Sequence, residues 1–213
     1  MDQPRSSADR LTATAAKLRA LTELSAGPYD AFLYDCDGTL ADSMPGHKRS
    51  YVQVAANSGL DLDDRIIDEL AGMPIPVVIG EINRRYNTNF DPVRFAEEKE
   101  RLFFAEHIQL VQPIDFVVEH MKAHRGTKRL AVVSGSARRS VEKTLSVVGI
   151  ADLPELLVCA GETPRGKPHP DPFLAAAAQL GVAPERCLVF EDGDFGVQAA
   201  EAAGMKWIRI DKL

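Results

Sequence analysis

The sequence has 213 residues, of which 45% are hydrophobic and 26% charged, and its formal net charge is -6. This composition is typical of a globular protein with one core, which may carry a smaller inserted unit. Lysine and arginine are scattered along the chain, so nucleic acid is not expected as a partner. No stretch approaches the roughly 18 uncharged apolar residues that span a bilayer, so no membrane partner is expected either.

Cysteine usage points to a reducing compartment. Cys36, Cys159 and Cys187 lie far apart and form no C-x-x-C pair, which argues against a disulfide framework and a thiolate zinc site. The N-terminus lacks the apolar region of a signal peptide. We therefore expect a cytoplasmic protein, and we expect it to be a monomer.

The first predicted element is a helix over residues 8–25. Leucine and alanine recur there at helical spacing, and Gly27 and Pro28 provide a stop signal. We interpret residues 1–26 as a helical extension that packs on the core.

A short strand ending at Tyr34 is followed by a long helical block. From Pro45 to about Gln112 the sequence predicts helices near 46–58, 63–71, 77–87 and 91–108, and no strand competes. We expect residues 44–112 to form a helical cap domain, inserted after the first strand.

Strands and helices alternate after Pro113. The pattern predicts helices over 114–124, 137–148, 172–180 and 195–203, and strands over 129–134, 155–160, 186–191 and 206–210. Asp171 is expected to cap the helix that begins at Pro172. The alternation predicts an α/β fold, a doubly wound parallel sheet with helices on both faces, built from residues 27–43 and 113–213.

The first strand delivers two carboxylates to its carboxyl end, in the stretch "AFLYDCDGTLADS" over residues 31–43. Alternate residues of a strand point the same way, so Asp35 and Asp37 share a side while Cys36 faces the other. Ligands of open α/β sheets bind at this end of the strands. Gly38 permits a tight turn whose N–H groups can face an anion. A surface turn rich in Asp and Gly is the alternative.

Three later segments carry polar groups in similar places. Ser134 and Gly135 end one strand with a hydroxyl and backbone donors that suit phosphate, although the same residues suit an ordinary helix cap. Lys167 lies in a loop stiffened by prolines, where a solvated lysine is the alternative. Glu191 and Asp192 end another strand. Four such motifs in order favour one shared site over four separate turns.

These motifs resemble those of the haloacid dehalogenase superfamily, in the branch with a helical cap inserted after motif I. Residues 35–39 match motif I, Ser134 motif II, Lys167 motif III, and residues 191–192 motif IV. The stretches "KPHPDPF" and "EDGDFGVQAAEAAGM" resemble the beta-phosphoglucomutase-related subfamily, and within it the bacterial sugar phosphatases of the fructose-1-phosphate type. Gly193 departs from this pattern, since serine is usual there.

The resemblance implies Mg²⁺ as cofactor. Asp35, Asp37 through its backbone carbonyl, and Asp192 would hold the ion, with Glu191 as direct or indirect support. Physical reasoning agrees, because carboxylates about 5 Å apart repel by roughly 3 kcal/mol per pair at an effective dielectric near 20. Hard oxygen ligands favour Mg²⁺ at such a place.

The resemblance also implies catalytic roles. Asp35 attacks phosphorus and forms an aspartyl-phosphate. Asp37, with a pKa that we expect burial to raise, protonates the leaving oxygen and later deprotonates water. The phosphate-binding groups are expected to be Gly38, Ser134, Gly135 and Lys167.

We expect the substrate to be a small phosphorylated metabolite, and we expect the cap to recognise the part of it other than the phosphate group. His47 matches a histidine of the subfamily near the proton-transferring aspartate, although a surface histidine is the alternative. Lys99 in "EEKER" is a second candidate, against a solvated charge. Ser43, just before the cap, is the third and marks a possible hinge.

The sequence leaves three other functions open and disfavours a fourth, dehalogenation. A phosphosugar mutase uses the same core, but such enzymes usually carry an Arg after a cap glycine, where "AGMPIPVV" offers Ile75 and prolines. Phosphoglycolate phosphatase is another hydrolase reading. A non-catalytic receiver-like module has little use for the cap or for Asp37, and dehalogenation needs neither Asp37 nor a metal.

Overall fold

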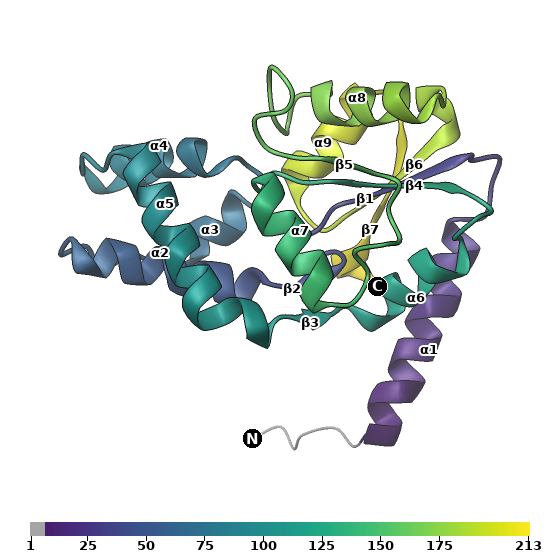
Figure 1. Cartoon of the computed structure of the whole chain (residues 1–213), viewed down its shortest axis with the longest axis horizontal. Coiled ribbons are helices and arrows are strands. Elements are labelled where there is room, and N and C mark those ends of the chain that lie inside the picture. Colours follow the sequence, from purple (N-terminus) through teal and green to yellow (C-terminus); the bar gives the residue numbers. More distant parts are fainter. Residues whose placement is uncertain (1–6) are drawn as a thin grey trace.

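A parallel sheet of five strands forms the centre of residues 7–213, the part of the chain that the computed structural model describes, with side chains from Leu11 onward (Figure 1). Residues 1–6 of the expected extension lie outside the described residues. The strand order is β5-β4-β1-β6-β7. The bounds are β1 (Ala31–Tyr34), β4 (Arg129–Val133), β5 (Leu156–Val158), β6 (Cys187–Glu191) and β7 (Lys206–Arg209). The predicted α/β fold is confirmed.

Helices cover both faces of this sheet. One face carries α6 (Asp115–Ala123) and α7 (Arg138–Val147), and the other carries α8 (Asp171–Leu180) and α9 (Asp194–Ala202). Short 3₁₀ turns, η3 (Pro184–Arg186) and η4 (Ile210–Lys212), flank the last two strands. The expected cap by Asp171 is wrong: Asp171 is already the first helical residue, and its carboxylate accepts hydrogen bonds from Arg165 instead.

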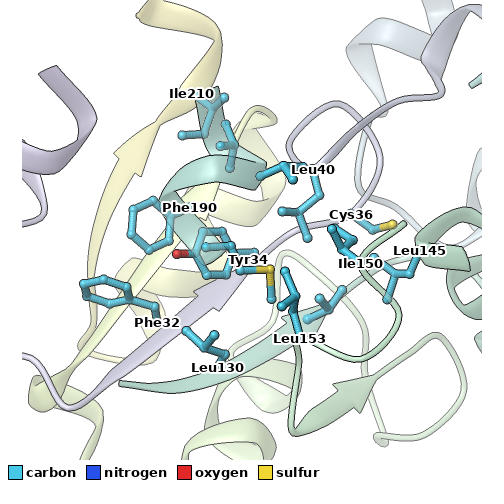
Figure 2. Close-up of a cluster of buried hydrophobic side chains, with 14 of the residues drawn as sticks. Phe32, Tyr34, Cys36, Leu40, Leu130, Leu145, Ile150, Leu153, Phe190 and Ile210 are labelled. Carbon is cyan, nitrogen blue, oxygen red and sulfur yellow. The ribbon is translucent and has the colours of Figure 1, made fainter. Parts of the chain in front are cut away.

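Strand β1 is buried on both faces, as a central parallel strand must be. Phe32, Tyr34 and Cys36 point into the apolar cluster of Figure 2, and Ala31 and Leu33 point into the cluster on the opposite face. This alternation leaves the side chains of Asp35 and Asp37 away from Cys36, as predicted.

The cap helices pack around an apolar cluster of their own, beside the sheet (Figure 1). They are α2 (Met44–Asn57), α3 (Arg65–Glu69), α4 (Ile75–Tyr86) and α5 (Pro92–Leu102), which continues as a π-helical turn, η1 (Phe103–His107), and a 3₁₀ turn, η2 (Ile108–Leu110). Each predicted cap helix therefore exists, and the last one is shorter and ends irregularly.

A two-stranded antiparallel ribbon that the sequence reading missed joins the two parts. It pairs β2 (Ala41–Asp42) with β3 (Gln112–Pro113). Two residues per strand are too few to show an alternating pattern. The chain leaves the core and returns to it side by side at this ribbon, next to the predicted cap boundaries, which stay a prediction.

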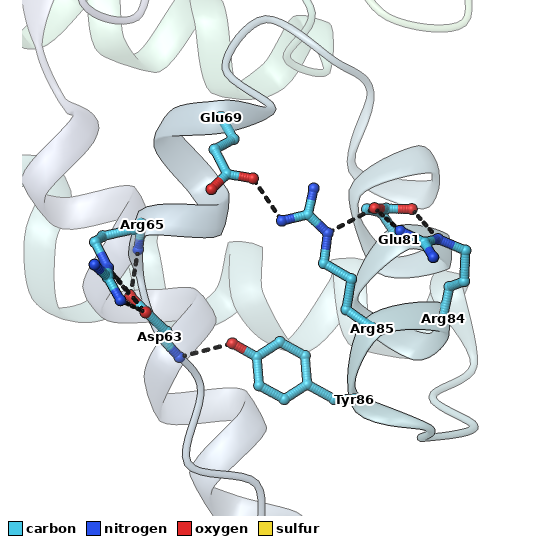
Figure 3. A network of polar contacts seen from close by, with 7 residues as sticks. All are labelled: Asp63, Arg65, Glu69, Glu81, Arg84, Arg85 and Tyr86. Atoms are coloured by element: carbon cyan, nitrogen blue, oxygen red, sulfur yellow. Dashed lines mark hydrogen bonds and ion pairs between the residues drawn. The ribbon is translucent and has the colours of Figure 1, made fainter.

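A polar network fixes the spacing of α3 and α4 (Figure 3). Arg85 donates hydrogen bonds to Glu81 in its own helix and to Glu69 at the end of α3, at 2.6 Å and 2.5 Å. The Tyr86 hydroxyl accepts a hydrogen bond from the backbone N–H of Asp63. These contacts brace both helices that flank residues 70–74.

The N-terminal helix, α1 (Ser7–Leu24), packs along α6 with Leu21 fully buried. The predicted apolar stripe is only partly covered, because Leu11 and Leu24 are 72% and 56% exposed. None of the helices in residues 7–213 is long and apolar enough to cross a bilayer. The expected cytoplasmic location and monomeric state stay predictions.

Candidate active site

The carboxyl ends of the central strands gather the predicted groups at one cavity. The register aligns Tyr34 with Val132 and with Phe190, so the residues that follow β1, β4 and β6 lie level. A cavity of about 60 Å³ lies there, between core and cap. Its lining includes the predicted residues Asp35, Asp37, His47, Lys99, Ser134 and Gly135.

Lys167 is buried among acceptors at the core end of the cavity. Its Nζ donates hydrogen bonds to Asp35 Oδ1 at 2.6 Å, Glu191 Oε1 at 2.5 Å and the Val133 carbonyl at 2.9 Å. Burial alone lowers the pKa of Lys167, but the two carboxylates outweigh burial and hold the pKa above its ordinary value. Lys167 is therefore a fixed positive charge.

Asp35, Glu191 and Asp192 form an acidic cluster whose ligand atoms lie within 4.8 Å of one another. Burial, followed by the charges of Glu191 and Asp192, raises the pKa of Asp35 well above its usual range, against the opposing charge of Lys167. Burial and the Glu191 charge raise the pKa of Asp192 to about 7. The cluster therefore favours additional positive charge.

This cluster fits a hard divalent cation. All its donor atoms are carboxylate oxygens, the ligands that Mg²⁺ prefers. A Cβ added to Gly38 would lie 2.2 Å from Asp192 Oδ2, so only a glycine, here at φ +92°, lets this carboxylate approach the turn. Thr39 donates a hydrogen bond to Asp192 Oδ1 at 3.0 Å and orients it.

Asp37 points to a different set of partners. Its Oδ1 accepts hydrogen bonds from Ser43 Oγ at 2.6 Å and His47 Nε2 at 3.2 Å, and its Oδ2 accepts one from Ser136 Oγ at 2.7 Å. Burial alone would raise the pKa of Asp37, but the interactions with His47, Ser43 and Ser136 outweigh it and hold the pKa well below its usual range. The expected raised pKa is therefore wrong for this closed geometry.

His47 links Asp37 to Lys99. Lys99 Nζ lies 2.6 Å from His47 Nδ1 and donates to it, so the hydrogen bonds assign the ring proton to Nε2, which donates to Asp37. The His47 ring stacks on Phe103 at 3.9 Å. Burial and the Lys99 charge lower the pKa of His47, which agrees with a neutral ring.

Lys99 is buried, not solvated. It is 4% exposed, and its Nζ lies 5.2 Å and 5.4 Å from the ring centres of Tyr51 and Phe103. In the described part of the chain, no carboxylate lies within ion-pair distance of Lys99, and burial lowers its pKa to about 8.

The remaining wall of the cavity comes from the cap and is mostly apolar. Besides Tyr51, it is formed by Met44, Ile67, Leu70, Ala71, Gly72, Met73, Ile75 and Val78. Opposite this wall, Ser134 Oγ accepts a hydrogen bond from the Ser136 backbone N–H at 3.0 Å. The cavity is thus lined by charged groups on the side of the core and by mostly apolar groups on the side of the cap.

The structure brings together every residue that the sequence nominated for the site. Reasoning from the sequence assigned no separate role to Thr39 and Ser136, which orient Asp192 and Asp37. Their signal was present as the threonine of "DGT" and the second serine of "SGS". The aromatic packing of Tyr51 and Phe103 on Lys99 had no local signal.

Known proteins resemble this chain over most of its length. A family model described as haloacid dehalogenase-like hydrolase matches residues 29–204. The chain is 34% identical over 185 residues to fructose-1-phosphate phosphatase YqaB of Escherichia coli, covering 87% of this chain and 98% of that protein. It is also 34% identical over 186 residues to hexitol phosphatase B of Escherichia coli, covering 84% and 82% of the two chains.

Solved structures share the fold. A hydrolase from Pseudomonas syringae superposes with a TM-score of 0.75 at 21% identity, covering 84% of each chain. A beta-phosphoglucomutase from Clostridium difficile superposes with a TM-score of 0.71 at 26% identity, covering 85% of this chain and 84% of the other.

Proposed function

The chain belongs to the haloacid dehalogenase-like hydrolases and is a phosphatase, and from this premise we propose that it hydrolyses phosphate esters of small sugars, such as fructose 1-phosphate, with Mg²⁺ as cofactor. The observation that carries the proposal is the difference between the surroundings of two carboxylates that line the same cavity. Asp35 lies among a lysine and two acids, whereas Asp37 lies among hydroxyls and an imidazole. Two carboxylates in such different surroundings suit two different roles.

Asp35 is the proposed nucleophile. Its oxygen attacks phosphorus, the bond from phosphorus to the sugar oxygen breaks, and an aspartyl-phosphate forms. The Ser134 hydroxyl, the N–H groups near Gly38 and Gly135, and Lys167, which donates to Asp35, would bind the transferring phosphoryl oxygens. Water then cleaves the aspartyl-phosphate and releases inorganic phosphate.

The acidic cluster is the proposed Mg²⁺ site. Asp35, Asp192 and the backbone carbonyl of Asp37 would hold the ion, and Glu191, which already accepts from Lys167, would support it. Bound there, Mg²⁺ supplies charge that neutralises the phosphoryl oxygens and favours the ionised form of Asp35.

Asp37 is the proposed proton carrier. It gives a proton to the leaving sugar oxygen and takes one from the attacking water. Its pKa is low in the closed geometry, but an anionic phosphate ester beside the carboxylate raises it. His47 and Ser43 lower this pKa; His47 lies in the first helix of the cap and Ser43 immediately precedes that helix, so cap movement also changes the pKa of Asp37.

A panel of phosphate esters tests this proposal. We expect phosphate release from fructose 1-phosphate and from hexitol phosphates to exceed release from phosphoglycolate, to stop with EDTA and to return with Mg²⁺. A coupled assay with beta-glucose 1-phosphate measures mutase activity. We expect little of it, because a mutase must bind a second phosphate with its cap, and Ile75 and the neighbouring prolines carry no positive charge. Metal-independent release, or faster mutase turnover, contradicts the proposal.

Two substitutions assign the roles. Asp35→Asn and Asp37→Asn each remove turnover by at least about 10⁴-fold, because each deletes a group that acts on the reacting atoms. Asp152→Asn, at an exposed carboxylate paired with Arg125, is the matched control and keeps wild-type turnover. Full activity of either variant at position 35 or 37 refutes the assignment.

A further inference from the structure

Three core glycines lie directly beneath the cap loop, defined here as residues 71–74 between α3 and α4. A Cβ added to Gly135 would lie 2.3 Å from the carbonyl oxygen of Gly72. One added to Gly166 would lie 2.8 Å from Pro74 Cγ, and one added to Gly193 would lie 3.2 Å from the Ala71 oxygen. Real Cβ contacts below 3.0 Å are essentially absent, so the first two positions exclude a side chain in this geometry.

The backbone of the core does not require these glycines. None of Gly135, Gly166 and Gly193 adopts a positive φ, so alanine is compatible with the conformation of each. In each case the nearest atoms to the added Cβ belong to the cap loop. Glycine is therefore required here by the closed position of the other part of the molecule, and not by the local fold.

Closure and opening are both needed at this cavity. About 60 Å³ is well below the roughly 300 Å³ of pockets that enclose drug-sized ligands. The cap loop forms part of the roof through Ala71, Gly72 and Met73. This space is too small to enclose a sugar phosphate, so the cap loop would lift off the glycines to admit one and return to exclude water from Asp35.

The cap loop cannot easily yield on its own. Pro74 limits its backbone, and the Arg85 contacts with Glu69 and Glu81 hold the helices on either side of it (Figure 3). A methyl group added at one of these three glycines would therefore displace the cap loop together with the rest of the cap, including His47 and Lys99.

We propose that Gly135, Gly166 and Gly193 form a flat glycine floor that positions the cap loop and sets how far the cap closes over the cavity. Gly166 and Gly193 are positioning residues, since they act through the cap, whereas Gly135 also belongs to the proposed phosphate-binding groups. The test by enzyme activity rests on the phosphatase function proposed above. The test by hydrogen exchange of the cap loop does not.

The decisive variants are Gly166→Ala and its partner Pro74→Ala. Gly166→Ala lowers kcat/KM for the sugar phosphate by about 10-fold or more, because a displacement near 1 Å at an active site costs rates of this order. Pro74→Ala removes the ring carbons that the new methyl would meet. The double variant therefore regains most of the lost activity, whereas Pro74→Ala alone changes it by only about two-fold.

Matched measurements separate closure from folding. Gly80→Ala, in α4 with nothing within 4 Å of the added Cβ, keeps wild-type activity and is the control. The urea unfolding midpoint of Gly166→Ala stays at the wild-type value, while hydrogen exchange of the cap-loop amides becomes faster. We expect Gly135→Ala to accelerate that exchange most and Gly193→Ala least, because the distance from the added Cβ to the cap loop is shortest at Gly135 and longest at Gly193.

Clear outcomes overturn the inference. Wild-type exchange in the cap loop of Gly166→Ala, or a double variant as impaired as the single one, refutes the glycine floor. If the wild-type protein releases no phosphate from any sugar ester, the proposed function fails, and the exchange series still tests the floor.

Discussion

The two ends of the cavity each hold a buried lysine, and the surroundings of the two lysines are opposite. Lys167, at the core end, contacts two carboxylates that raise its pKa. Lys99, at the cap end, contacts an imidazole and two aromatic rings, and its pKa falls to about 8. The lysine at the core end is thus stabilised by carboxylates, whereas the lysine at the cap end stays buried without an ion pair, at a cost in stability.

This difference indicates where each lysine acts. A buried cation without an ion pair destabilises a fold, so its presence implies a use other than stability. Lys99 donates to His47 Nδ1, which leaves the ring proton of His47 on Nε2, and it lines the cavity on the cap side. Lys167 donates to Asp35 and is the cation that we propose to neutralise the phosphoryl group.

The largest expected effect follows from Lys167→Met. Loss of the cation leaves Asp35 and Glu191 buried without a partner, so we expect the free energy of unfolding to fall by about 3 kcal/mol. Turnover falls by about 10³-fold or more, since a charge on the phosphoryl group is lost. Urea unfolding and phosphate release measure both, with Lys122→Met at an exposed pair as control. Wild-type turnover would remove Lys167 from the mechanism.

Lys99→Met should separate stability from activity. The apolar side chain suits the aromatic surroundings, so we expect the free energy of unfolding to rise by about 1–3 kcal/mol, the scale of the lowered pKa. We expect kcat/KM for sugar phosphates to fall by about 10-fold, because His47 loses the donor that sets its tautomer. If this variant is less stable than wild type, the contrast between the two lysines fails.

The pH dependence of stability sharpens the same contrast. The folded-state pKa of Lys99, about 8, lies below the value near 10.4 of an unfolded chain, so the unfolded state binds more protons between these values and stability rises with pH there. The advantage of Lys99→Met over wild type therefore shrinks between pH 8 and 10. The pKa of Lys167 is raised, so this lysine stays protonated in the folded state and largely protonated in the unfolded state over that interval. The stability lost in Lys167→Met therefore does not change with pH there. Parallel curves for wild type and Lys99→Met would contradict this.

The smallest effect is expected at the exposed network of the cap. Arg85→Ala removes contacts with Glu69 and Glu81, whose pairs are partly exposed, so we expect the free energy of unfolding to change by less than about 1 kcal/mol. Urea unfolding measures this change. A loss as large as that of Lys167→Met would mean that exposed and buried pairs do not differ in this protein.

The core end of the cavity could be predicted from sequence because strand geometry alone assembles it. Side chains alternate along β1, and parallel strands end at the same edge, so the positions of Asp35 and Asp192 follow from the pattern. Lys167 required the family resemblance, because a loop carries no periodic signal.

The cap end was less predictable because contacts distant in sequence determine it. Lys99 sits in a run of charges, yet Phe95, Lys99 and Leu102 share one helical face, and all three are buried. The pKa of Asp37 depends on Ser136, which lies 99 residues away in the sequence, and on cap closure. No local pattern reports such partners.

The segment that precedes the family match also supports the first strand, through the residue that follows α1. Ser25 Oγ lies 2.8 Å from His120 Nε2, and the Tyr34 hydroxyl lies 2.9 Å from His120 Nδ1, with all three side chains buried. Tyr34 is the residue immediately before the proposed nucleophile. Trimming the protein to begin at residue 29 would remove the hydrogen-bond partner of His120 Nε2, at a cost of about 1–3 kcal/mol, next to the residue that precedes the proposed nucleophile.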